Sequence, residues 1–599
     1  MDFKQLYSLL KSHYSAKDLE RNTRELFELE KRICHDDFDR STAYVVQELQ
    51  KAGFSDVERI EHVADGETAF ADSIMPEAWN LDGRAYLEVV SPWREGERII
   101  ADTNEVPFAA ATWCGATPDE GACGELILFD PQHPEKAQGK WVLINGMPSG
   151  SINQPLARAG ALGIVSVTWD QGWENPDSTR WLNGQGSWGW YYVKGDLRLP
   201  IFSITARRAI SLITELKTGR AVVLKGVLKA RYGKGKIYTV TARIPGESAE
   251  EYGIFAHMYE PFLSDDCSGA ASCIQIGRMI KESGIRLKRS LRVVLSFEHY
   301  GFAAYFAGCK HNLKAGMNMD MFATTMYRDL GFPLHWRLST MSLPFFGDLL
   351  MQTIIRQTNP ELRIDPTYGN LSDDTLAGEP SYNIPTNWLY VENEPSPLHH
   401  SSSELFNGVD WELAETVSTL VATLGAFLIS ADKEDYEAVL PELTDLAVSA
   451  VTDHRFDTPF ERKVRCDFAA GQLESINNWM PGIMDQQSAG AIIAPYRIDG
   501  DELTAATENE KTAARMFVTR QITGTPWSLA AIPYAERNYH GGRINKLFFT
   551  LCDGTRSLLE AIRIADVAHY NTTSDEKIGC VIKFMRYLEK YGYVKIALQ

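Results

Sequence analysis

Between Lys234 and about Ser430, short apolar runs alternate with helical segments, and this alternation is the strongest constraint on the fold. A strand, a helix and a second strand make a βαβ unit, and successive units build a largely parallel sheet. We therefore expect an α/β domain with a mixed, mainly parallel sheet and helices on both faces. Such sheets assemble their sites at the carboxyl ends of the strands, so polar residues at those ends are the first candidates for function.

Several apolar runs in this region end in side chains that bind metals. YGIFA leads into His257, LRVVLSF into Glu298 and His299, AGMNM into Asp320, and NWLYV through a short loop into His399 and His400. Between the first two runs, Asp265 and Asp266 precede a Ser-Gly turn and an apolar helix, which holds a carboxylate at a helix amino terminus. Zinc binds imidazole and carboxylate groups, and a hydrolytic site also needs a carboxylate that deprotonates water. The set supplies both kinds of residue.

The order of these motifs resembles that of the zinc aminopeptidases of clan MH. Their pattern is a strand-end His, Asp-x-x-Ser-Gly, Glu-Glu-x-Gly, Asn-x-Asp-Met and a late His-Ser/Thr-Ser, and here AHMYEP, DDCSG, EHYG, NMDM and HHSSSEL follow one another. The resemblance implies that zinc is held by His257, Asp265 and Asp320. It implies a second zinc, bridged by Asp265, that is also held by the residue after the general base and by His400.

The general base implied by the resemblance is Glu298, which takes a proton from the attacking water and delivers it to the leaving amine. Two positions depart from the family pattern. Tyr259 stands where many relatives have an Asp that orients the first His, and Glu260 is expected to take over that role. His299 stands where the pattern has a carboxylate ligand, so one or two zinc ions are expected, the second more weakly held. His400 is preferred to His399 as a ligand because it directly precedes Ser-Ser.

The rest of the chain divides into further regions. We expect N-terminal helices of the peptidase-like domain in residues 1–77, a Trp-rich insert in 78–229, the catalytic domain in 230–430, a mainly helical connection in 431–541 and a winged-helix-like domain in 542–599. The insert holds nine of the fourteen tryptophans and resembles a protease-associated domain, lodged between the first helices and the catalytic sheet. Its tryptophans are expected to pack the β-rich module. A second interpretation makes Trp181, Trp188 or Trp190 a lid over an apolar substrate, and Asp373 is a candidate for substrate contact.

Composition limits the partners. With 60 Lys+Arg and 79 Asp+Glu the formal charge is −19, which argues against nucleic-acid binding through bulk charge. The winged-helix-like region carries nine basic and six acidic residues, a net charge of +3 that favours contact with a protein, or self-association, over DNA. Nine scattered cysteines without a CxxC motif fit a reducing compartment. No apolar run suggests a signal peptide or a membrane span, so we expect a cytoplasmic protein with no membrane contact.

Three functions are compatible with these residues. The first is a zinc-dependent aminopeptidase or related amide hydrolase that acts on a small peptide or peptide-like metabolite. The second keeps the fold but uses one zinc for intramolecular acyl transfer, as glutaminyl cyclases of the same clan do, with Glu298 shuttling protons. The third is a degenerate peptidase fold that serves as a binding or scaffold protein. The joint presence of a base and its expected ligands favours the hydrolase.

Overall fold

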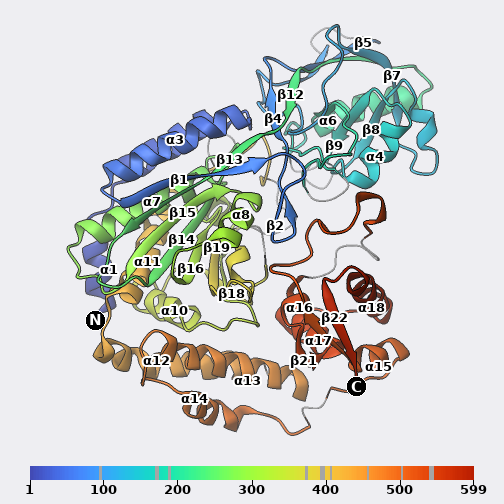
Figure 1. Ribbon diagram of the computed structural model, residues 1–599. Helices are drawn as coiled ribbons and strands as arrows, with labels where there is room; N and C mark the ends of the chain where they lie inside the picture. Colours follow the sequence, from blue (N-terminus) through green and yellow to red (C-terminus); the bar gives the residue numbers. More distant parts are fainter. Residues whose placement is uncertain are drawn as a thin grey trace.

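The computed structural model describes residues 1–92, 98–168, 175–186, 190–371, 375–391, 398–404, 408–454, 457–500, 503–538 and 546–599. Figure 1 shows an α/β body, a lobe above it formed by the insert, and a C-terminal unit below that lobe. A row of helices connects the body to the C-terminal unit along the lower edge.

An eight-stranded sheet forms the centre of the body, in the order β1-β13-β15-β14-β16-β19-β17-β18. Its strands are β1 (Ser55–Ala64), β13 (Gly235–Ile244), β14 (Glu251–Met258), β15 (Ser290–Phe297), β16 (Leu313–Met319), β17 (Leu334–Arg337), β18 (Ile364–Thr367) and β19 (Thr386–Tyr390). The pairs β14–β15, β14–β16, β16–β19 and β17–β18 are parallel. The remaining pairs, β1–β13, β13–β15 and β17–β19, are antiparallel. The predicted mixed, mainly parallel sheet is confirmed.

Helices cover both faces of this sheet because neighbouring strand residues point to opposite sides. Ile254 of β14 and Val293 of β15 belong to the main core, which contains α7 (Cys267–Glu282) and α11 (Trp411–Ser430). Phe255 and Val294, the next residue on each strand, pack on the other face with α8 (Tyr300–Gly308). Strands that are buried on both faces consist of continuous apolar runs, and this pattern allowed them to be predicted from the sequence.

The first three helices pack around the main core. They are α1 (Phe3–Lys11), α2 (Ala16–Glu30) and α3 (His35–Lys51), and the body also contains α9 (Met326–Asp329) and α10 (Gly347–Thr358). Side chains of Asp2 and Ser15 accept hydrogen bonds from the first turns of α1 and α2, which fixes where each helix begins. Helix α2 contacts α7, and α3 contacts β1 and β13, so the residues before the insert belong to the α/β body.

The insert has a sheet of its own, in the order β10-β9-β8-β7-β11-β5-β6. Its elements are β5 (Tyr86–Ser91), β6 (Ile99–Asp102), β7 (Ala122–Leu128), β8 (Trp141–Asn145), α4 (Gly150–Arg158), β9 (Gly163–Val167), β10 (Ile201–Ser203), α6 (Ala206–Lys217) and β11 (Val223–Val227). Trp141 is fully buried against Gly163 and Gly226, where a Cβ atom would come within 2.2 Å and 2.6 Å of its ring. This tryptophan therefore packs the module. Two short ribbons, β4 (Ala78–Leu81) with β12 (Ala230–Gly233) and β2 (Ala69–Phe70) with β3 (Ser73–Ile74), lie beside the lobe and the body.

The connection consists of α12 (Lys433–Thr452), α13 (Pro459–Glu474) and α14 (Gln486–Ile493). The C-terminal unit contains α15 (Glu508–Ala514), β20 (Met516–Arg520), α16 (Lys546–Thr550), β21 (Asp553–Ser557), α17 (Leu558–Ala568), α18 (Asp575–Lys590) and β22 (Val594–Leu598). Strand β20 pairs with both β21 and β22. The unit therefore extends back beyond the expected boundary at residue 542, because strand pairing joins segments that are distant in sequence.

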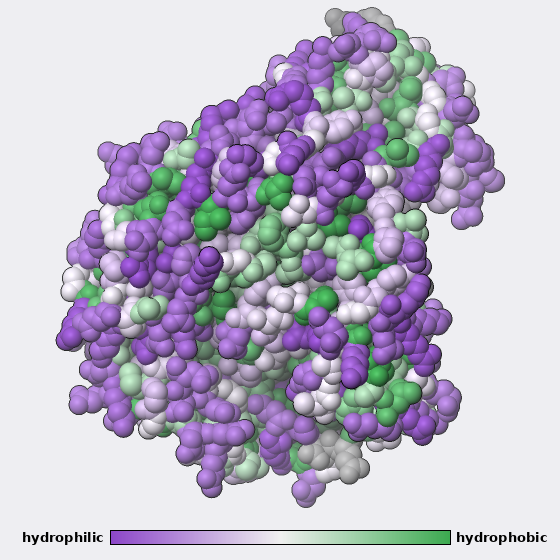
Figure 2. Space-filling view, in the orientation of Figure 1, coloured by the Kyte–Doolittle hydropathy of each residue, from purple (hydrophilic) through white to green (hydrophobic). Residues whose placement is uncertain are grey.

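Helix α11 is long and apolar enough, by length and composition, to cross a membrane, contrary to the sequence expectation. In the fold, 89% of its apolar window is buried inside the protein. It packs against α7, α1 and α10. Its composition is explained by its place at the centre of the body. Hydrophilic residues cover most of the molecular face seen in Figure 2, and hydrophobic residues form small separate groups.

Candidate metal centre

The strand ends predicted to carry chemistry meet at one edge of the central sheet. His257 is the second-last residue of β14, Glu298 directly follows β15, and Asp320 directly follows β16. Because β14 lies between β15 and β16 and is parallel to both, the three side chains reach one cavity. The cavity has a volume of about 240 Å³. Its lining residues are Met147, Trp181, Asn183, Gln185, Trp190, His257, Glu260, Asp265, Glu298, Asp320, Met321, Trp388, Tyr390, His399 and His400.

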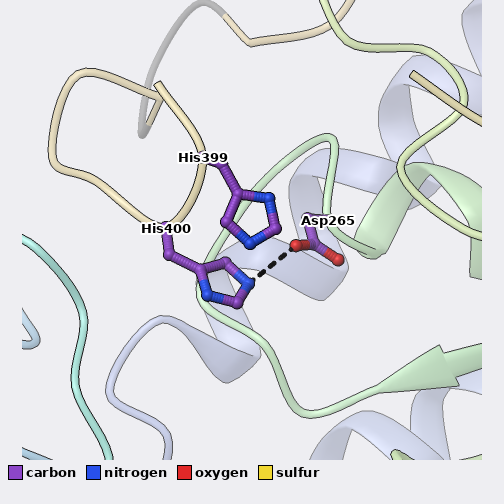
Figure 3. A group of neighbouring side chains, drawn as sticks. All are labelled: Asp265, His399 and His400. Carbon is purple, nitrogen blue, oxygen red and sulfur yellow. Dashed lines mark hydrogen bonds and ion pairs between the residues drawn. The ribbon is translucent and has the colours of Figure 1, made fainter. Parts of the chain in front are cut away.

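The carboxylate of Asp265 lies between two histidines. Its Oδ1 atom is 3.3 Å from Nε2 of His257, and its Oδ2 atom is 3.0 Å from Nε2 of His400. Figure 3 shows the imidazole of His400 directed at this carboxylate, with His399 beside it. Each oxygen thus faces a different histidine, which is the arrangement expected of a carboxylate that bridges two cations.

Glu260 joins the same group of side chains. Its Oε2 atom lies 3.3 Å from Nε2 of His400 and 4.0 Å from Nε2 of His257. The residue is 2% exposed, and among the described residues no hydrogen bond reaches Oε2. Its carboxyl group also hydrogen-bonds to Glu298. The expected role of Glu260, to orient His257 from behind, does not match this position on the Nε2 side of the ring.

Asp266 occupies the other side of the His257 ring. Its Oδ2 atom is 3.9 Å from Nδ1 of His257, and its Oδ1 atom accepts the backbone N–H of Gly269 at the start of α7. Asp266 thus lies on the Nδ1 side of this imidazole, the side on which a carboxylate can orient a metal-binding histidine. It also forms a group of possible ligands with His257 and Asp320, whose ligand atoms lie within 4.8 Å of one another.

Burial and mutual repulsion set the charges of the two central carboxyl groups. Burial, followed by the negative charge of Asp265, raises the pKa of Glu260 well above its usual value. Burial would also raise the pKa of Asp265, but hydrogen bonds from His257 and His400 hold it well below its usual value. Two adjacent buried carboxylates are costly without a cation. The donor set fits a bound divalent metal, and so does Oε2 of Glu260, which no hydrogen bond from the described residues reaches.

Of the other predicted site residues, one lines the cavity and another is buried in the core. His399 lines the cavity, with its ring centroid 3.7 Å from that of His400, and it forms a possible ligand group with His400 and Asp265. Tyr259 is buried in the core, where its hydroxyl donates to the carbonyl of Ile33. Asp373 and Trp188 lie outside the described residues.

His299 is not brought to the metal-binding group. Its Nε2 atom lies 2.9 Å from Oγ of Ser73, and its ring stacks on Trp527 with centroids 3.9 Å apart. Among the residues that the structure describes, the groups of possible metal ligands do not include it. The residue after Glu298 thus turns away from the cavity and contacts the segment between β20 and α16 of the C-terminal unit.

The insert completes the cavity and fixes the last histidine. The backbone N–H of Trp181 donates to the carbonyl of His400 at 2.7 Å, and Ser402 donates to the carbonyl of Thr179 at 2.8 Å. Trp181 and Trp190 both line the cavity, and their role as a lid stays a prediction. In addition, Trp190 packs edge-on against Trp527, with ring centroids 5.6 Å apart.

Some functional positions were missed in the sequence. In the sequence, Asp266 looks like the cap of the following helix. Its position next to Asp265 was the one feature that could have indicated a place in the site. Met147, Asn183, Met321, Trp388 and Tyr390 form cavity walls, yet nothing in their local sequence separates them from core residues. Their role depends on contacts between the insert and the sheet.

Solved structures share this fold. A zinc aminopeptidase from Bacillus subtilis aligns with 70% of this chain and 96% of its own, at 14% identity and a TM-score of 0.50. A peptidase M28 precursor from Shewanella amazonensis aligns with 72% of this chain and 96% of its own, at 16% identity and a TM-score of 0.54. No protein-family model matches the sequence, and no curated protein matches it. The chain has an aminopeptidase-like fold and contains groups of His, Asp and Glu side chains that could hold a metal ion.

Proposed function

We propose that the protein is a zinc-dependent aminopeptidase that hydrolyses the amide bond after the first residue of a small peptide or peptide-like metabolite. One observation carries this proposal: the two oxygens of Asp265 face His257 and His400 in a cavity that also contains Glu298. A bridging carboxylate with a second carboxylate nearby matches the needs of metal-assisted hydrolysis. The aminopeptidase-like fold supports the same function by analogy.

The ligands proposed for one zinc ion are His257, Asp265 and Asp320. A second ion would share Asp265 and bind His400. Zinc in such a set supplies positive charge that polarises the substrate carbonyl and promotes ionisation of water. The residues fit this ion because imidazole nitrogen and carboxylate oxygen are its common ligands outside thiolate sites.

Glu298 is proposed as the general base and acid. It follows β15 directly, lines the cavity and hydrogen-bonds to Glu260, so its carboxylate adjoins the ligand group without being central to it. A carboxylate in this place accepts a proton from water during attack on the carbonyl carbon. It then donates that proton to the leaving nitrogen, which breaks the amide bond and releases an amine.

The cavity walls support an apolar first residue in the substrate. Trp181, Trp190 and Met147 come from the insert, and Met321, Trp388 and Tyr390 come from the body. Burying a large side chain among such walls is favourable by about 1.5–3 kcal/mol. A carboxylate side chain in the same place would lose its hydration among these apolar walls, which is costly. The amine of a free N-terminus can instead reach the polar groups of the cavity, among them Glu298.

We therefore expect substrates with an apolar first residue to be preferred, because the cavity walls are apolar. With zinc-loaded protein, kcat/KM for the p-nitroanilides of Phe and Leu should exceed that for Glu by about 10–200-fold. N-acetyl-Phe-p-nitroanilide should not be cleaved, because acetylation removes the free amine that an aminopeptidase recognises. Trp190→Leu should lower kcat/KM for Phe-p-nitroanilide more than for Leu-p-nitroanilide. Trp411→Leu changes a tryptophan on α11 outside the cavity and serves as the matched control. Equal cleavage of the free and acetylated compounds would contradict an aminopeptidase.

A further inference from the structure

The site contains a carboxylate that the sequence did not predict as a ligand. Glu260 lies beside Asp265 and His400, whereas His299, the expected ligand, lies against Ser73 and Trp527. This placement bears on the second metal of the proposed zinc enzyme, and the inference rests on that proposed function.

Distances between the possible ligand atoms agree with a shared ion. Ligands bound at about 2.1 Å in a tetrahedral arrangement are separated from one another by about 3.4 Å. Nε2 of His400 lies 3.0 Å from Oδ2 of Asp265 and 3.3 Å from Oε2 of Glu260. One short movement of each side chain would therefore place all three atoms around one cation.

The fold of the chain around Tyr259 places Glu260 at the cavity. Tyr259 adopts a left-handed backbone conformation, with φ of 83°, directly after the end of β14. Its backbone N–H donates to Oε2 of Glu30 at 2.9 Å, and its ring packs edge-on against Phe38 in the core. While Tyr259 is held in the core in this way, the side chain of Glu260, the next residue, lines the cavity. Tyr259 thus acts as the anchor that turns Glu260 toward the histidines.

Electrostatics favours the same assignment. In the part of the chain that the structure describes, no hydrogen bond reaches Oε2 of Glu260, and such a buried carboxylate is stabilised by a cation more than by any neutral neighbour. With Glu260 in place of His299, the two ions would meet three carboxylates, from Asp265, Asp320 and Glu260, instead of two. The negative charge of Glu260 replaces the charge of the carboxylate that the family pattern has at position 299 and that His299 lacks.

We propose that Glu260 is a ligand of the second zinc ion, together with Asp265 and His400, and that His299 is not a ligand. His299 instead connects the end of β15 to the segment around Trp527. The second ion is thus bound by a residue from the β14 end of the sheet, three positions after His257.

The test is zinc binding by the full-length chain, stripped with a chelator and titrated with zinc chloride, with bound metal measured by mass spectrometry after gel filtration. The unchanged chain should bind two ions. Glu260→Gln should bind one, or bind the second at least about 100-fold more weakly, since it removes a ligand rather than an orienting group. His299→Asn should keep both, and asparagine tolerates the positive φ at this position.

Glu404→Gln is the matched control. Glu404 is also buried near Asp265, and no hydrogen bond from the described residues reaches its Oε2 atom either. Its Oε1 atom accepts from Ser264, however, and it is not one of the described residues that line the cavity. This variant should bind two ions. Circular dichroism of each metal-free variant separates ligand loss from misfolding. Two ions bound with unchanged affinity by Glu260→Gln, or loss of one ion in His299→Asn alone, would overturn the assignment. The readout is binding, so a chain that loads zinc as described but cleaves no peptide would overturn the proposed function and leave the ligand assignment standing.

Discussion

Glu298→Gln is expected to bind zinc as the unchanged chain does and to lose turnover by about 10²–10⁴-fold. Glutamine has nearly the same shape as glutamate but neither accepts nor delivers the proton that both halves of the reaction require. KM should change little, since the side chain lines the cavity without forming its apolar walls. Steady-state kinetics with Phe-p-nitroanilide, together with metal content, measure both effects.

A control for this variant is Glu404→Gln, which also neutralises a buried carboxyl group close to Asp265. It should retain turnover within a few-fold. If Glu298→Gln kept full activity, Glu298 would not be the base, and another cavity carboxylate would have to take its place.

Asp265→Ala is expected to have the largest effect, with loss of bound zinc and of hydrolysis together. Both oxygens of this carboxylate face candidate ligands, at 3.3 Å from His257 and 3.0 Å from His400. Removing this carboxylate should therefore weaken the binding of both proposed ions, whereas His400→Ala should weaken the binding of mainly one. Metal content and kcat/KM of the two variants, prepared side by side, check this difference.

Retention of two tightly bound ions by Asp265→Ala would contradict a bridging role. A helpful control is Asp329→Asn, an exposed carboxylate on α9 that forms an ion pair with Arg328 on the surface. It should match the unchanged chain in metal content and in rate, because its charge is solvated.

Much of the central fold could be predicted from the sequence because the relevant signals are local. Strands β14, β15 and β16 are continuous apolar runs, and the polar residues at their ends follow them directly in the chain. Parallel neighbours then bring His257, Glu298 and Asp320 to one edge. These features need no knowledge of distant contacts.

The direction of single side chains at the strand ends could not be predicted in the same way. His299 follows Glu298 immediately, yet it adopts a positive φ of 51° and stacks on Trp527, a residue far along the chain. Glu260 faces the histidines because Tyr259 is held by Glu30 and by the core of the N-terminal helices. Both outcomes depend on partners that are close only after folding.

The limits of the C-terminal unit and the role of the insert are likewise set by long-range pairing. Strand β20 belongs to the sheet of β21 and β22, although the chain between β20 and α16 is long. The backbone of Trp181 holds His400 through a hydrogen bond between the insert and the catalytic domain. A winged-helix-like unit that binds another protein, and a cytoplasmic location, remain predictions from the sequence.

The most direct test of a zinc aminopeptidase is to follow hydrolysis of Phe-p-nitroanilide while metal-free protein is titrated with zinc and bound zinc per chain is measured in the same samples. We expect no turnover without metal and a rate that rises with bound zinc until the site is full. A chain that binds zinc in the cavity but cleaves neither this substrate nor a panel of dipeptides at any occupancy would contradict the proposed function.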